Sequence, residues 1–76
     1  MGGSAVFADN IPVEDSTVVT MLREAGAVML GKLNMTEGAM GGYNPKLDVP
    51  ENPWRKSHWA GASSSGSGSA TAAGLA

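Results

Sequence analysis

The serines between Gly61 and Ser69 are the side chains of this sequence best suited to chemistry. The tract reads Gly-Ala-Ser-Ser-Ser-Gly-Ser-Gly-Ser, with no residue larger than serine. A serine hydroxyl can attack a carbonyl carbon or relay a proton, but it is a weak nucleophile until a base removes its proton. A catalytic role therefore requires a base and an element that holds one hydroxyl in place.

Two familiar motifs do not fit the tract. A phosphate-binding loop needs a lysine after its glycines, and none follows here. The nucleophile elbow Gly-x-Ser-x-Gly is matched only with alanine in first place, as Ala62-x-Ser64-x-Gly66. His58 and Asp48 could complete a Ser–His–Asp triad, but a lone loop histidine is more often a surface residue.

The composition of the tract is also that of a flexible linker, which is the main structural alternative. Two flanking segments count against a linker. The tract follows the specific segment Asn52–Trp59, and it precedes Ala70–Leu75, which predicts a small-residue helix. Small residues let a helix approach a neighbouring backbone closely, and a tether does not need this property.

The upstream sequence predicts one helix and one strand. Asp15 or Ser16 can cap a helix, and Gly26 suits the position after its end. Between them the apolar residues recur at helical spacing, which predicts a helix at about 16–25. The apolar run 27–30 predicts a buried strand, and the order helix-then-strand is typical of an α/β layer.

The remaining chain is less regular. Asn34 and Glu37 resemble a capping box, which predicts a short helix near 35–40. The segment 41–60 contains three prolines and is predicted to be an ordered loop. The Gly/Ser segment 61–69 is predicted to be a second loop that leads into the small-residue helix.

Composition limits the chain to at most one small domain. Val, Ile, Leu and Phe make 13 of the 76 residues, about 17 per cent, which is below the share usual for chains that fold alone. The single histidine and the absence of an acidic cluster predict no metal and no cofactor. A net charge of −2 and short apolar runs argue against nucleic acid and membrane partners. The absence of cysteine fits a cytoplasmic location, and Met1–Ser4 is no secretory signal but could be an added start.

Several blocks of the chain resemble the amidase signature family in order and spacing. They are Asp15–Val19, Leu22–Val28, Gly31–Glu37, Asn52–Trp54 and Gly61–Ser67. The resemblance covers nearly the whole chain but a minor part of a domain of several hundred residues. It implies that residues 1–76 are a partial amidase-signature domain, a fragment of an α/β/α fold with a mixed central sheet.

The resemblance also implies a Ser–Ser–Lys triad, in which a lysine is the base and one serine relays the proton. By the family pattern Ser63 is the relay serine, joined to Ala62 by a cis peptide in the complete domain. The trans form is expected in the isolated chain, because it is by far the commoner form of a non-proline bond. Ser64 is expected to orient the relay or to donate a hydrogen bond, and Ser65 and Gly66 are expected to begin a helix whose free N–H groups face the active site.

The other two members of the triad are not expected in this chain. The nucleophilic serine belongs to an Asp-Thr-Gly-Gly-Ser block beyond Ala76, and the catalytic lysine to a block before Met1. Lys32 lies in a later block and is expected to be structural or to position a loop.

The resemblance therefore predicts a fragment of a hydrolase that cleaves carboxylic amides through an acyl-enzyme, inactive by itself. Its expected partners are a small amide and the remainder of the domain. The alternatives are a non-catalytic binding or assembly module and a truncated or artificial chain built on the same segment.

Overall fold

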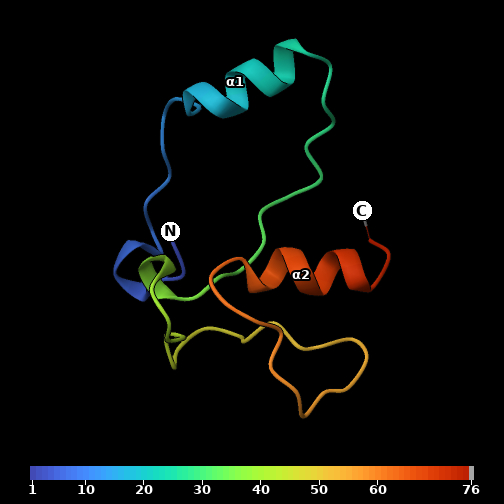
Figure 1. Ribbon diagram of the computed structural model, residues 1–76. Coiled ribbons are helices and arrows are strands. Elements are labelled where there is room, and N and C mark those ends of the chain that lie inside the picture. The colour runs from blue at the N-terminus through green and yellow to red at the C-terminus, as the bar shows by residue number, and fades with distance from the viewer. Residues whose placement is uncertain (76) are drawn as a thin grey trace.

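The computed structural model describes residues 1–75, and Ala76, the last residue of the predicted small-residue segment, lies outside the described residues. Its elements are the 3₁₀ helix η1 (Ala5–Phe7), helix α1 (Thr17–Glu24), the 3₁₀ helix η2 (Glu37–Ala39) and helix α2 (Ser65–Ala72). Figure 1 shows α1 standing apart from the other elements at the end of two long connections. None of the helices within residues 1–75 has the length and hydropathy needed to cross a membrane.

The end of helix α1 shows why the helix stops where it does. Gly26 adopts a φ of +88°, a conformation that glycine tolerates far better than other residues. Its N–H donates to the Arg23 carbonyl at 3.0 Å, and the N–H of Ala27 donates to the Leu22 carbonyl at 2.9 Å. These two bonds are the Schellman arrangement, which satisfies carbonyls that a helix end would otherwise leave free.

The start of helix α1 differs from the expected capping. Ser16 occupies the cap position with an extended backbone, but its side chain makes no capping hydrogen bond. The Asp15 carboxylate instead pairs with the Arg23 guanidinium in the last turn. Both side chains of this ion pair are largely exposed, so its contribution to stability is small.

The predicted strand at 27–30 is not formed. No residue between 1 and 75 belongs to a strand, so the expected α/β fold with a mixed central sheet is wrong for the described chain. Val28 and Leu30 are 81% and 75% exposed rather than buried. A strand needs a neighbour that exchanges backbone hydrogen bonds with it, and residues 1–75 contain no such neighbour.

Helix α2 begins at Ser65, inside the segment whose composition predicts a loop but where the family resemblance predicts a helix start. The predicted Gly/Ser loop 61–69 is loop only as far as Ser64, and Ser65 already starts the helix. The segment 41–60 contains turns, bends and irregular chain. The start of this segment is held near the loop before α2 by the Tyr43 hydroxyl, which donates to the Gly61 carbonyl at 3.0 Å.

No apolar side chain is buried within residues 1–75. The buried side chains among them are the polar Ser4, Thr36 and Ser65, while the apolar face of α1 is open to solvent. Hydrophobic burial is the main force that favours folding. The described chain therefore has little to offset the conformational entropy that ordering removes.

We expect the isolated chain to show no cooperative unfolding transition. A buried leucine contributes only about 1.5–3 kcal/mol, and no leucine of residues 1–75 is buried. Far-UV circular dichroism at low protein concentration should lose helical signal gradually on heating. A sharp and reversible two-state melt would contradict this expectation and reveal a self-sufficient fold.

Candidate functional site

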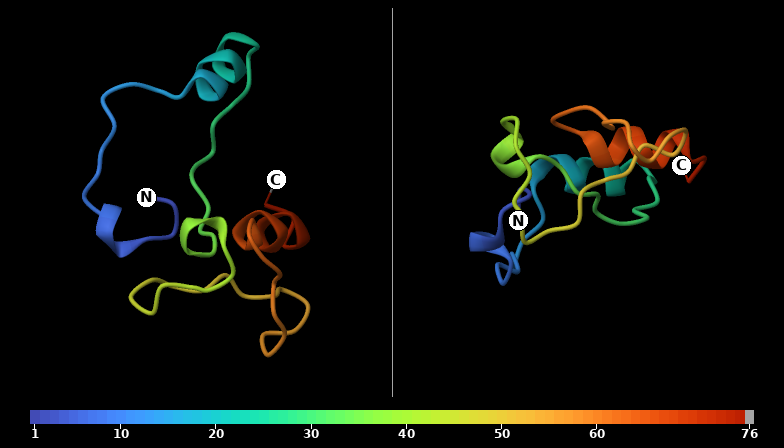
Figure 2. Two further views of the ribbon diagram at one scale, coloured as in Figure 1. Left: turned by 60° about the vertical axis from the view of Figure 1, so that its left-hand side comes forward. Right: turned by 90° about the horizontal axis from the view of Figure 1, so that it is seen from below.

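Three segments that are distant in the sequence come together near the start of α2, with the middle one in contact with each of the other two. They form what we call the junction: Gly2–Ser4, Asn34–Glu37 and Ser63–Gly66. The Thr36 N–H donates to the Ser63 carbonyl at 3.2 Å, and the Gly66 N–H donates to the Asn34 carbonyl at 3.1 Å. Figure 2 (left) shows η2, which continues the middle segment, lying between η1 and α2. The junction thus fixes the backbone on both sides of Ser64.

Two glycines allow the backbones of the junction to touch. A Cβ on Gly66 would lie 2.3 Å from the Asn34 carbonyl oxygen, and one on Gly3 would lie 2.5 Å from the Met35 carbonyl oxygen. Gly3 also has a φ of +67°, in the left-handed region. Both positions therefore require a residue without a side chain.

The predicted site residues lie together at the junction but differ in exposure. Ser63 is half-buried, Ala62 and Ser64 are exposed, and Ser65 and Gly66 are buried. The Ala62–Ser63 peptide bond is cis, which differs from the trans form expected for the isolated chain. The hydrogen bonds that hold the Ser63 carbonyl and the Gly66 amide come from residues of this chain.

The junction encloses two hydroxyl groups without partners. Thr36 is 0% and Ser65 is 1% exposed, and neither hydroxyl forms a hydrogen bond with any group in residues 1–75. A buried hydroxyl without a partner destabilises a structure by about 1–3 kcal/mol. Such groups are uncommon in proteins and call for a physical explanation.

Glu37 ties the junction to the loop that follows it. Hydrogen bonds from the Asn44 amide, 3.0 Å from the carboxylate, and from the Ser4 hydroxyl lower the pKa of Glu37 below its ordinary value. The Glu37 N–H donates to the Gly42 carbonyl at 2.7 Å, which closes the turn. These contacts use Glu37 differently from the capping box that the sequence predicts with Asn34.

We expect Asn44→Ala to raise the pKa of Glu37 toward the value of a free glutamate. The Asn44 amide is the larger cause of the lowered pKa, because it donates to the charged form. Since the folded pKa is depressed, the stabilisation is present above the ordinary pKa and is lost as pH falls through the lowered one. Carboxyl ¹³C shifts recorded during an acid titration measure this change, with the chain held in a complete folded domain. Asn52→Ala is the matched control, and an equal shift in both variants would exclude the contact as its cause.

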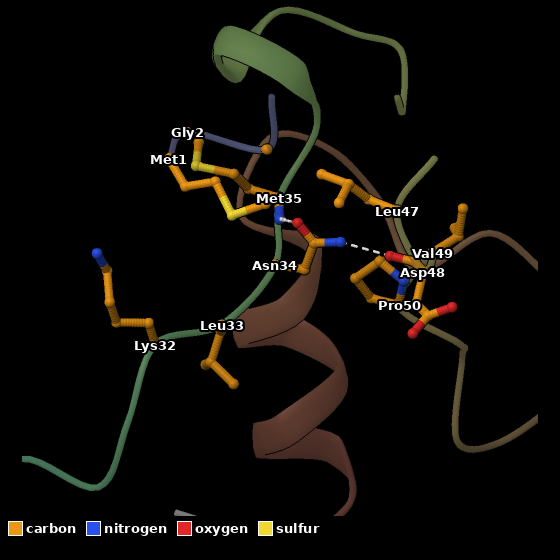
Figure 3. A pocket seen from close by; sticks show the side chains of 11 residues that line it. Met1, Gly2, Lys32, Leu33, Asn34, Met35, Leu47, Asp48, Val49 and Pro50 are labelled. Carbon is orange, nitrogen blue, oxygen red and sulfur yellow. Dashed lines mark hydrogen bonds between the residues drawn. The ribbon is translucent and has the colours of Figure 1, made fainter. Parts of the chain in front are cut away.

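A cavity of about 590 Å³ lies on one side of the junction. Figure 3 shows Lys32 and Asp48 at its edge and the Asn34 amide between them. The Asn34 Nδ2 donates to the Asp48 carbonyl, and its Oδ1 accepts from the Met35 N–H at 2.9 Å. Lys32 also lines this cavity. The sequence predicts that this lysine is structural or positions a loop and is not a member of the triad.

The alternative Ser–His–Asp triad gains no support. The His58 ring is 3.4 Å from the Ser57 hydroxyl on an exposed loop, whereas Asp48 lines the cavity. Residues 1–75 contain no group of three or more histidine, aspartate or glutamate side chains that could hold a metal ion.

Sequence reasoning does not identify Thr36, Gly3 or Ser4 as parts of this site. The sequence predicts a loop or an added segment at the start of the chain, yet the Gly38 N–H donates to the Gly2 carbonyl at 2.8 Å and Gly3 packs on Thr36. Adjacent glycines can signal a close backbone approach. Nothing in the sequence indicates which backbone is approached.

Comparisons with known proteins give one consistent result. The family model described as Amidase matches residues 1–76. A protein described as amidase AmiD, from Mycobacterium tuberculosis strain H37Rv, is 60% identical over 73 residues. A subunit of the glutamyl-tRNA(Gln) amidotransferase from Moorella thermoacetica is 51% identical over 75 residues. Both alignments cover 96% of this chain, and no solved structure shows a significant match to it.

The chain spans 15% of the length of each of these relatives. The resemblance seen in the sequence blocks is therefore confirmed along the full chain. The chain corresponds to only a minor part of a complete relative. Because the family model matches the chain over its whole length, the chain belongs to the amidase family.

Proposed function

We propose that this chain carries the proton-relay serine, Ser63, of an enzyme that cleaves carboxylic amides. The observation that supports the proposal most is the junction. It holds the Ser63 carbonyl and the start of α2 through bonds to residues 34–36. A relay group must be fixed within hydrogen-bond distance of two partners, about 2.6–3.2 Å.

In the proposed reaction a serine supplied by the rest of the domain attacks the amide carbonyl carbon. Its proton passes to the Ser63 oxygen, while the Ser63 proton passes to a neutral lysine, also from the rest of the domain. The C–N bond then breaks, and the lysine proton returns through Ser63 to the leaving nitrogen. A water molecule then attacks the acyl carbon while its proton passes through Ser63 to the lysine. The bond between the acyl carbon and the serine oxygen breaks, and the proton returns through Ser63 to that oxygen.

The neighbours of Ser63 have supporting roles in this proposal. Ser64 orients the relay, and the exposed Ala62 leaves space for substrate and for the other catalytic groups. Ser65 begins α2, and the partial positive charge of this helix end favours a developing anion, whereas the Gly66 N–H already donates to the Asn34 carbonyl.

The remainder of an amidase domain is proposed to cover the exposed apolar side chains of α1 and of residues 27–30. Val18, Met21 and Leu22 of α1 are 66%, 64% and 46% exposed, and Val28 and Leu30 are more exposed still. Apolar residues on one helical face and in a run of strand type are normally covered. Most of the length of a relative lies outside the part that this chain matches. That remainder could supply both covers.

Hydrolysis is proposed rather than transfer of the amide nitrogen to an acceptor. The chain is 60% identical to AmiD and 47–51% identical to the matched amidotransferase subunits. Water is accordingly the expected acceptor of the acyl group.

The test uses AmiD in which the 73 matching residues are replaced by this chain, called the AmiD host. We expect the host to release ammonia from simple carboxylic amides, to form hydroxamates with hydroxylamine and to react with a fluorophosphonate. The isolated chain should do none of these above its Ser63→Ala variant, because it lacks the nucleophile and the lysine.

Two results would contradict the proposal in different ways. Turnover by the isolated chain that Ser63→Ala abolishes would make Ser63 a nucleophile. A folded host that is inert toward both amides and fluorophosphonate, alongside active AmiD, would favour a non-catalytic binding module.

A further inference from the structure

Tyr43 connects the loop after η2 to the segment that carries Ser63. Its hydroxyl donates to the Gly61 carbonyl oxygen at 3.0 Å, across 18 positions of the chain. Tyr43 and Gly61 are both half-buried, which strengthens this hydrogen bond relative to one in open water. Within residues 1–75, no other hydrogen bond reaches Gly61 or Ala62. The Tyr43 hydroxyl therefore holds the backbone immediately before Ser63.

The backbone after Ser63 is held by a different bond. The Thr36 N–H donates to the Ser63 carbonyl oxygen at 3.2 Å. Because a peptide unit is planar, a bond to its carbonyl oxygen restrains the whole unit. The bonds from Tyr43 and Thr36 restrain the peptide units that follow the Cα atoms of Gly61 and Ser63. Ser63 is thus held from both sides.

Glu37 fixes the position of Tyr43. The Glu37 N–H donates to the Gly42 carbonyl at 2.7 Å, and the Glu37 carboxylate accepts from the Asn44 amide at 3.0 Å. Gly42 and Asn44 are the two neighbours of Tyr43, so the backbone on each side of the tyrosine is anchored to the same glutamate. The residue before Glu37 supplies the other restraint on Ser63. Two adjacent residues thus set both restraints.

We propose that Tyr43 is a positioning residue for Ser63, whose hydroxyl group it keeps in place relative to the catalytic groups supplied by the rest of the domain. A proton relay works only while its hydroxyl lies about 2.6–3.2 Å from both partners, so a small displacement of Ser63 slows the reaction. This inference rests on the proposed function of Ser63. Tyr43 acts through the backbone, so the role requires no contact with substrate or reacting atoms.

The first test is Tyr43→Phe in the AmiD host. This substitution retains the ring but removes the bond to Gly61, and it should lower kcat for amide hydrolysis by about three- to tenfold, the effect of one neutral hydrogen bond. KM should change little, because the role does not involve substrate binding. Ser69→Ala is the matched control and should leave kcat unchanged. The Ser69 hydroxyl donates to the Glu51 carbonyl across the same 18 positions, but not beside Ser63.

A double substitution separates positioning from a general structural effect. In a host that already carries Ser63→Ala, Tyr43→Phe should leave the residual rate of fluorophosphonate labelling unchanged, because no relay remains to be positioned. A further fall of the same size in that background would overturn the inference, since Tyr43 would then act independently of Ser63.

Two phenylalanine analogues in place of Tyr43 give a second comparison, which remains usable if Tyr43→Phe does not fold. Of the two, p-aminophenylalanine keeps a hydrogen-bond donor at the para position, whereas p-methylphenylalanine fills the same space without a donor. The amino variant should retain most of the kcat of the host. The methyl variant should show the same fall in kcat that is expected of Tyr43→Phe.

The outcomes distinguish this inference from the proposed function. Equal rates for the two analogues, or an unchanged kcat in Tyr43→Phe, would overturn the role of Tyr43. If Ser63→Ala leaves the host active, the proposed function fails, and the inference fails with it. If Ser63→Ala inactivates the host but loss of the Tyr43 hydroxyl does not lower kcat, only the role of Tyr43 fails.

Discussion

Ser63→Ala in the AmiD host is expected to lower kcat for amide hydrolysis by about a thousandfold or more, because members of a catalytic triad act as a unit. Without the Ser63 hydroxyl, the proton of the attacking serine has no path to the lysine. Ammonia release and fluorophosphonate labelling should fall together, because both require the activated nucleophile. The thermal midpoint should stay close to that of the unmodified host, since the Ser63 carbonyl bond to Thr36 uses only the backbone.

Ser57→Ala is the control for this substitution, because Ser57 is an exposed serine on a loop outside the junction. It should leave both rates unchanged. Retention of most of the activity in Ser63→Ala, with an intact thermal midpoint, would remove the relay role from Ser63.

Gly66→Ala is expected to disrupt the junction, whereas Gly68→Ala, the other glycine substitution in α2, is not. The new Cβ would lie 2.3 Å from the Asn34 carbonyl oxygen and 3.0 Å from the Leu33 Cβ, so backbone must shift. Overpacking of this kind costs about 1–3 kcal/mol, and more where backbone is the obstacle. The host should melt at a lower temperature and lose activity, because Ser63 moves with the displaced segment.

Gly68→Ala is the matched control on the same helix. An added Cβ there would lie 3.6 Å from the Ala60 carbonyl oxygen, which is an ordinary contact. Alanine is a better helix former than glycine by about 0.5–1 kcal/mol, so this variant should be at least as stable as the parent. Equal destabilisation by both substitutions would show that helix propensity, rather than the contact with Asn34, sets the effect.

Local features of the fold could be predicted from the sequence because their causes are local. The helix predicted at 16–25 contains the observed Thr17–Glu24, and Gly26 adopts the left-handed conformation that ends it. The three prolines of 41–60 likewise accompany a segment of turns and irregular chain. Each of these outcomes depends on residues within a few positions of one another.

The strand at 27–30 shows where such reasoning ends. Its apolar run indicates what the segment would do beside another strand, but a strand exists only as part of a pair. Within residues 1–75 the partner is absent and Val28 is exposed. The predicted sheet is not formed within residues 1–75 because the partner strand is missing there, and the apolar run carries no information about that partner.

The candidate site divides in the same way. The serine tract and the surrounding blocks were enough to determine the family and to direct attention to Ser63, because residue types in a fixed order are a property of the sequence. Tertiary structure alone decided that Asn34–Glu37 meets this tract, that Gly3 packs on Thr36, and that Thr36 and Ser65 are buried. Such contacts join residues roughly 30 positions apart, and they depend on how two backbones approach across a glycine, which no local pattern specifies.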